Sequence, residues 1–173
     1  MLSGCKFENA PKGLAIDYPY FITRDSLLVK KIMVPKGTKL IYEENPFVKG
    51  EQFALLDENK LTTIKLPYGE TISWAGVPVT EIDKFYNEEM RGVTVYADFE
   101  KLSADKRTKF SELWRSCEDG LGVGVKNIDD WSFNPKNISD IESCSVLYQR
   151  FFKDSINQQK FLDNILIELK KLK

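Results

Sequence analysis

The sequence predicts a single α+β domain over residues 1–173, mostly β in 1–80 and mostly α in 81–173. Two observations carry this prediction. Six of the seven prolines fall in the first 80 residues, where they interrupt helices and separate short strands. From residue 80 onward, apolar residues recur at helical spacing instead. Strands followed by helices indicate an α+β fold rather than alternating βαβ units, and the content of 42% hydrophobic and 29% charged residues is that of an ordinary globular domain.

The first half predicts an N-terminal antiparallel sheet or small barrel of short strands. Branched and aromatic residues form short runs bounded by turn residues, a pattern typical of strands. In the turn at 34–37, Pro35 presets its own φ, and Gly37 supplies a positive φ. The expected strands cover residues 20–23, 26–33, 38–42, 52–55, 61–66 and 71–74.

The C-terminal half is predicted to be mainly helical, with one late strand. Ser and Thr residues that precede helically spaced apolar residues mark four helix N-termini. The four expected helices begin at residues 80, 103, 139 and 155, and the first two end near residues 90 and 119. Residues 93–99 alternate as a strand. Residues 120–138 are expected to form a long loop that begins with a glycine-rich helix cap.

The absence of histidine excludes several classes of function. Ser-His-Asp and Cys-His catalysis, histidine-ligated zinc or iron, and histidine pH switches all require that residue. Lys and Arg number 25 against 26 Asp and Glu, and residues 1–80 and 81–173 carry net charges of +1 and −2. Neither segment has the basic excess that neutralises many phosphates, so a nucleic-acid partner is not expected.

Cysteine usage and hydropathy predict a cytoplasmic protein. The three cysteines, Cys5, Cys117 and Cys144, are widely spaced and form no C-x-x-C pair. Free thiols in a reducing compartment are therefore expected. No apolar run approaches the roughly 18 residues of a transmembrane helix, so no membrane contact is expected.

The strongest candidate for a binding surface is Asp129, Asp130, Trp131 and Phe133. These residues lie in the expected long loop, and such loops are often functional. Rigid aromatic side chains dominate binding energy at protein interfaces, so this group is expected to contact a protein partner. One alternative is that both rings fold back onto the core. Another is that the two carboxylates hold a hard cation, but neighbouring side chains usually diverge, and no metal site is predicted.

A histidine-free enzyme is the second hypothesis. Arg24, then Ser73 on an expected strand, then Glu88 or Glu89 follow an order that resembles the arginine-clamped NAD-dependent ADP-ribosyltransferases. The resemblance implies an arginine on the pyrophosphate, a glutamate that stabilises the oxocarbenium-like ribose, and a substrate of the nucleotide or sugar class. The Ser-Thr-Ser and Glu-x-Glu elements of that family are absent from this chain.

We therefore expect a small soluble binding protein that acts by macromolecular contact. Its many lysines relative to arginines are typical of an A/T-rich coding sequence, so one concrete form is a phage or mobile-element accessory protein that inhibits a host protein in the host cytoplasm. No cofactor is expected, because the glycine cluster at 120–124 follows an expected helix and lacks the ending of a phosphate loop. The third hypothesis is a structural subunit, which an exposed apolar patch or a self-associating edge strand would indicate.

Overall fold

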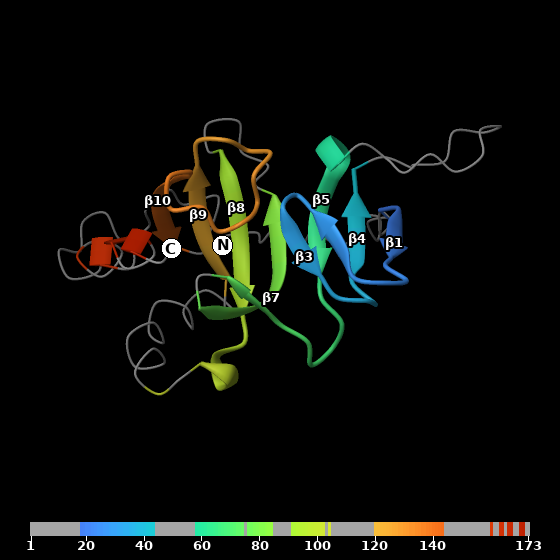
Figure 1. The fold of residues 1–173 in the computed structure, drawn as a ribbon. Coiled ribbons are helices and arrows are strands. Elements are labelled where there is room, and N and C mark those ends of the chain that lie inside the picture. Colours follow the sequence, from blue (N-terminus) through green and yellow to red (C-terminus); the bar gives the residue numbers. More distant parts are fainter. Residues whose placement is uncertain are drawn as a thin grey trace, which may run out of the picture.

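The computed structural model describes residues 18–43, 58–74, 76–84, 91–102, 104 and 120–143, together with seven positions between 160 and 171. Within these residues the protein is mostly β (Figure 1). The strands are β1 (Tyr20–Ile22), β2 (Leu27–Val29), β3 (Ile32–Val34), β4 (Lys39–Tyr42), β5 (Leu61–Lys65), β6 (Ile72–Trp74), β7 (Val77–Lys84), β8 (Gly92–Ala97), β9 (Gly120–Val125) and β10 (Ile138–Ser143). Short 3₁₀ turns, η1 (Glu58–Lys60) and η2 (Phe99–Lys101), precede β5 and follow β8.

Eight of these strands form one antiparallel sheet in the order β1-β4-β5-β7-β8-β9-β10, with β6 paired to β7 beside this path. Strands β2 and β3 form a separate hairpin. β1 and β10 lie at opposite ends of the sheet (Figure 1), so each is a terminal strand of the described sheet. Within the described residues, the sheet therefore has two edges and does not close into a barrel.

The register assigns alternate side chains to two faces of the sheet. The core face carries buried apolar side chains, and one row of it crosses five strands through Leu40, Ile64, Ile82, Val95 and Leu121. The opposite face, which we call the second face, is more polar. Its matching row runs through Ile41, Thr63, Asp83, Thr94 and Gly122.

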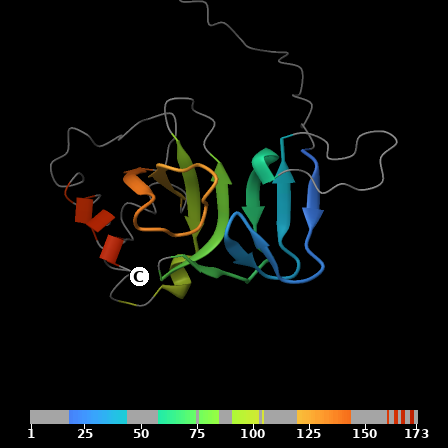
Figure 2. The same cartoon turned by 45° about the horizontal axis from the view of Figure 1, so that its top comes forward.

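The β2–β3 hairpin covers the core face near β5 and β7, as Figure 1 and Figure 2 show. Its inward side chains, Val29, Ile32 and Val34, belong to the same buried cluster as the sheet. Two residues, Lys30 and Lys31, connect the strands, with φ values of 46° and 66°. Positive φ at both positions is the geometry of a type I′ turn, which matches strand twist but favours Asn-Gly over two lysines. Contacts made by the two lysines must therefore help to hold this turn.

The described structure is mostly β in both halves, so the prediction of an α+β fold with a helical C-terminal half is wrong. The first expected helix starts where β7 is observed. The apolar residues of β7, Val77, Val79 and Ile82, are all buried, and the strand pairs with β5, β6 and β8. Partners on both edges of a strand outweigh the weak local preference for a helix.

The loop expected at 120–138 is wrong at its two ends, where β9 and the start of β10 lie, and only residues 126–137 form a loop. The helix expected from residue 139 is wrong over residues 139–143, which belong to β10. In β9, Leu121, Val123 and Val125 lie on the core face, while the glycines alternate with them on the second face. Glycine weakens a strand because it brings no side chain to pack, so the sequence of this segment predicts a turn rather than a strand. Ile138 and Ile141 of β10 complete the core at this end of the sheet.

Several expected elements lie outside the described residues. They are the strand at 52–55 and nearly all of the helix at 103–119, together with the three cysteines. The described positions between 160 and 171 have helical backbone. In the part of the chain that the structure describes, no helix is long and apolar enough to cross a membrane.

Replacing Gly37 with alanine is expected to lower the free energy of unfolding by about 1–2 kcal/mol. Gly37 has a φ of 86°, and an added Cβ would lie 3.1 Å from Cγ of Pro67. Gly69 provides the control, because its φ is 81° but nothing lies within 4 Å of an added Cβ. Denaturant unfolding should therefore show a smaller loss for Gly69→Ala. Equal losses would mean that the Pro67 contact contributes nothing.

Candidate functional site

The Asp129–Trp131 segment lies in a loop of residues 126–137 that its own hydrogen bonds hold in place. Asn137, which is buried, accepts from the backbone N–H of Asn127 at 2.6 Å and donates to the carbonyls of Asn127 and Asp130 at 3.0 and 3.2 Å. A backbone hydrogen bond of 2.8 Å from Lys126 to Asn137 closes the base of the loop. This segment, which we call the 126–137 loop, is therefore an ordered part of the fold.

The aromatic rings of this loop turn inward. Trp131 is only 2% exposed, and its Nε1 donates to the carbonyl of Ile128 at 2.9 Å. Its own carbonyl accepts from Nε1 of Trp74 at 3.3 Å. Phe133 packs edge-on against Trp74, with ring centroids 5.1 Å apart. This is the arrangement of the alternative in which both rings fold back onto the core, and it leaves the ring of Trp131 unavailable to a partner.

The two neighbouring carboxylates diverge, and each pairs with one lysine of the β2–β3 turn. Lys31 donates to Asp130 at 3.2 Å, and Lys30 forms a longer ion pair with Asp129 at 3.6 Å. The Lys30 ammonium also lies 5.9 Å from the centroid of the Trp131 ring. We call these two pairs the lysine clamp. It joins segments about a hundred positions apart in sequence, and it accounts for lysines in a turn that favours Asn-Gly.

Asp130 has the stronger pairing of the two acids. Burial alone would raise its pKa, but hydrogen bonds from Ser132 and Lys31 outweigh burial and lower the pKa below its usual value. The Ser132 hydroxyl and backbone N–H donate to its Oδ1 at 2.6 and 3.1 Å. The charged form is therefore the one that the loop holds. Among the described residues, no group of three or more acidic or cysteine side chains could hold a metal ion.

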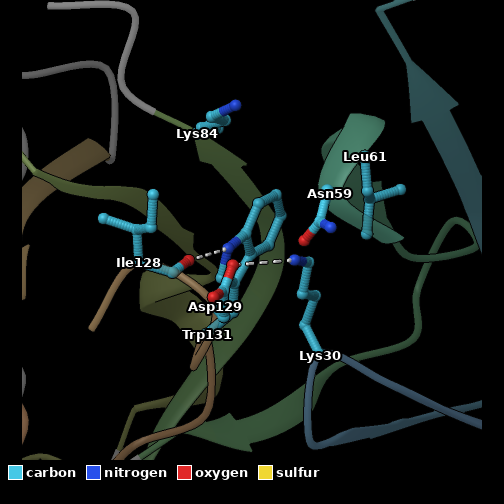
Figure 3. Close-up of a pocket in the computed structure, with 7 residues that line it drawn as sticks. All are labelled: Lys30, Asn59, Leu61, Lys84, Ile128, Asp129 and Trp131. Atoms are coloured by element: carbon cyan, nitrogen blue, oxygen red, sulfur yellow. Dashed lines mark hydrogen bonds and ion pairs between the residues drawn. The ribbon is translucent and has the colours of Figure 1, made fainter. Parts of the chain in front are cut away.

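A pocket of about 230 Å³ opens beside the lysine clamp. Figure 3 shows the Lys30 side chain rising toward Asp129, with Trp131 on one side and Asn59 and Leu61 on the other. Four segments meet here: the β2–β3 turn, the η1–β5 junction, the end of β7 and the 126–137 loop. We call it the Lys30 pocket; its lining residues are Lys30, Asn59, Leu61, Lys84, Ile128, Asp129 and Trp131.

The residues of the ADP-ribosyltransferase-like hypothesis are not seen to form one site. Arg24 is exposed in the bend between β1 and β2, and Ser73 is exposed on β6 opposite Pro78. Neither residue lines the Lys30 pocket or the larger cavity near Lys65 and Asp98. Glu88 and Glu89 lie outside the described residues.

Asp83 on β7 is a half-buried acid that sequence reasoning missed. Desolvation, followed by the charge of Glu81, raises its pKa to about 6, although hydrogen bonds from Thr63 and Tyr96 act in the opposite direction. Its buried Oδ1 has no hydrogen-bond partner among the described residues. The neighbouring Glu81 pairs with Lys65 at 2.7 Å. No sequence signal marked Asp83, because residues 80–90 were expected to be helical.

The edge formed by β1 was also missed as a site. The Pro19 carbonyl accepts a hydrogen bond from the backbone N–H of Tyr42, and the backbone N–H of Thr23 donates one to the Thr38 carbonyl. The backbone groups of the odd-numbered residues at β1 therefore point toward β4.

The backbone groups of Tyr20 and Ile22 must then point to the other side of β1, where no strand pairs with it among the described residues. We call this side the open edge of β1. Tyr20 and Ile22 are exposed on the second face. Tyr18, two positions before Tyr20, is also exposed, and the two-residue alternation of a strand would place it on the same face. The alternation Tyr-x-Tyr-x-Ile at 18–22 was the signal that could have identified it.

Comparison with known proteins adds no assignment to these geometric observations. No protein-family model matches the chain, and no curated protein or solved structure shows significant similarity to it. A proposal about function therefore depends on the exposed surfaces, pockets and charges described above.

Proposed function

We propose that this chain binds a protein partner by accepting an extended segment of that partner at the open edge of β1. The observation that supports this most directly is the apolar stripe of Tyr18, Tyr20 and Ile22 along a terminal strand. In strand addition, main-chain hydrogen bonds supply affinity, and alternate side chains supply specificity. β1 offers both, because its outward backbone groups lie at the edge and its exposed side chains lie on one face.

The distribution of exposed apolar side chains supports a protein partner. Of the nine large apolar side chains exposed in the described residues, six fall between residues 18 and 33. Natural edge strands are usually protected by charged side chains, and residues 18–22 contain none. Lys39 of β4 places its ammonium 4.0 Å from the centre of the Tyr20 ring. The edge therefore suits an apolar peptide segment better than a phosphate backbone.

The phage or mobile-element inhibitor expected from the sequence is one form of this proposal. It would place the partner in a host cytoplasm, and blocking would follow from occupation of the partner's extended segment. The residues that make the contact are then those of β1 rather than the aromatic residues of the 126–137 loop.

Replacing Ile22 with lysine is expected to weaken binding of an identified partner by about tenfold to a hundredfold. Ile22 is 60% exposed in the free chain, so the change removes apolar area that the partner would bury and places a charge beside the edge. The measurement is the dissociation constant of the purified pair. Leu28→Lys is the matched control, because Leu28 is 58% exposed but lies on the β2–β3 hairpin.

Two outcomes would contradict this function. If Ile22→Lys and Leu28→Lys weaken the complex equally, or neither does, β1 is not the contact. If the purified chain instead sediments as an oligomer that Ile22→Lys dissociates, a second copy occupies the edge. The structural-subunit hypothesis would then replace the proposal.

A further inference from the structure

A cavity of about 580 Å³ lies on the second face of the sheet, where the turn between β5 and β6 meets η2 (Figure 1). This volume falls within the range of about 300–1,000 Å³ that is typical of sites for organic ligands. None of its lining residues belongs to β1. We call it the Tyr68 cavity; it is lined by Lys65, Leu66, Pro67, Tyr68, Gly69, Thr80, Glu81, Asp98 and Lys101.

Tyr68 gives this cavity an accessible aromatic wall, because the residue is fully exposed at the rim. The backbone that carries the ring is held in place. The N–H of Glu70 donates to the Pro67 carbonyl at 3.0 Å, and Gly69 has a φ of 81°, as the third residue of a type II turn requires. The Lys101 ammonium of η2 also donates to the Gly69 carbonyl. A ligand that packs on the ring therefore has little backbone to order.

Charged side chains line the rest of the Tyr68 cavity, and their charges balance. Lys65 pairs with Glu81 at 2.7 Å, and the Lys101 ammonium lies 3.9 Å from Asp98. The exposed fractions of these four side chains lie between 23% and 56%, so a ligand can reach all of them. Two positive and two negative charges favour neither an anion nor a cation. The lining therefore suits a neutral polar ligand.

The two pairs leave hydrogen-bonding capacity for such a ligand. A lysine ammonium has three N–H donors, and a carboxylate has about four acceptor sites. The hydrogen bond and charge of Glu81 raise the pKa of Lys65, which therefore stays an ammonium ion at neutral pH. The Asp98 carboxylate is held by a hydrogen bond of 3.1 Å from the backbone N–H of Glu100. Donors and acceptors thus lie side by side, which matches hydroxyls, since each hydroxyl both donates and accepts.

We propose that the Tyr68 cavity binds a neutral sugar, with one face of a pyranose ring against Tyr68 and its hydroxyls against the charged side chains. The C–H groups on a pyranose face carry small positive partial charges, and the face of an aromatic ring is negative. A nucleobase is apolar on both faces and suits a slot between two apolar walls. Among the described residues that line the cavity, Tyr68 supplies the one aromatic ring. The sugar site is independent of partner binding at β1.

The test is titration of the full chain with four neutral disaccharides by isothermal calorimetry: maltose, cellobiose, lactose and N,N′-diacetylchitobiose. Circular dichroism checks that each variant folds. At least one disaccharide should bind saturably, with a dissociation constant below about 10 mM. Tyr68→Ala should weaken this binding at least about tenfold, whereas Tyr68→Phe, which keeps the ring, should weaken it less than about threefold.

A matched pair of variants tests the polar part of the site. Asp98→Asn should weaken disaccharide binding at least about threefold, because an amide accepts fewer and weaker hydrogen bonds than a carboxylate. Glu70→Gln removes an exposed carboxylate from the turn that carries Tyr68, but Glu70 does not line the cavity. It should change the affinity less than about twofold. If Asp98→Asn fails to fold, the Tyr68 variants decide, since a fully exposed ring adds little to stability.

Several results would overturn the proposal. One is the absence of saturable binding by all four disaccharides up to about 10 mM. Another is binding that Tyr68→Ala leaves unchanged, or that Asp98→Asn and Glu70→Gln weaken equally. Adenosine and inorganic phosphate serve as comparison ligands, and neither should saturate the protein at this concentration. Tighter binding of adenosine than of every disaccharide would assign a nucleoside site instead, and saturable binding of phosphate would assign an anion site.

Discussion

Replacing Trp131 with alanine is expected to lower the free energy of unfolding by about 3–5 kcal/mol, the range for removing a buried aromatic side chain. The ring is nearly inaccessible, donates to the Ile128 carbonyl and lies near the Lys30 ammonium. Its loss would open a cavity and leave the carbonyl of Ile128 without that donor. Denaturant unfolding followed by circular dichroism measures the effect.

The control is Trp131→Phe, which keeps an aromatic ring and loses the Nε1–H donor. Its loss in free energy of unfolding should be less than half of the loss that Trp131→Ala causes. A loop residue that serves only a partner would behave differently, because surface substitutions usually change stability by less than about 0.5 kcal/mol. A change of that size for Trp131→Ala would show that the ring is not part of the core.

Replacing Asp83 with asparagine is expected to raise the free energy of unfolding at pH 7 by about 1–3 kcal/mol. Burial, then the charge of Glu81, raises the pKa of this carboxyl from 3.8 to about 6. Below pH 3.8 it is protonated in both the folded and unfolded states. Above pH 6 it is ionised in both, and only the folded state then holds a charge in a poorly solvated place.

The contribution of Asp83 to stability therefore falls as pH rises from about 3.8 to 6 and stays low above that range. Asp83→Asn should remove this part of the pH dependence, as unfolding measured between pH 3.5 and 7.5 would show. Asp25→Asn, at an exposed position outside the sheet, should leave the slope unchanged. If Asp83→Asn destabilises the protein equally at both ends of the range, the carboxylate is not under strain.

The strands of the first half could be predicted because local chemistry specifies them. Gly37 takes the positive φ that its turn requires, and β4 and β5 lie within the ranges predicted for strands. β7 and β9 could not be predicted in the same way, since their conformation depends on partners far along the chain. Gly120–Val125 pairs with β8 and β10, and only these neighbours make a strand with three glycines stable.

The candidate site, too, could be predicted from the sequence only where it depends on neighbouring residues. The aromatic residues beside acids at 129–133 could be identified from the sequence as unusual. Whether their side chains point outward or inward could not, because the loop is held by Lys30 and Lys31, about a hundred positions earlier. A lysine pair between two apolar runs gives no sign of a tight turn, because the sequence favours one continuous strand there. The exposed edge of β1 required the sheet order, which local patterns do not contain.

Hydrogen exchange of the full chain with and without its identified partner tests the central claim most directly. In the free chain, the amides of Tyr20 and Ile22 should exchange rapidly, because they point to the open edge of β1. Partner binding should slow exchange at these two amides and leave those of residues 129–133 unchanged. Unchanged exchange at Tyr20 and Ile22, with new protection at residues 129–133, would contradict strand addition at β1 and return the contact to the 126–137 loop.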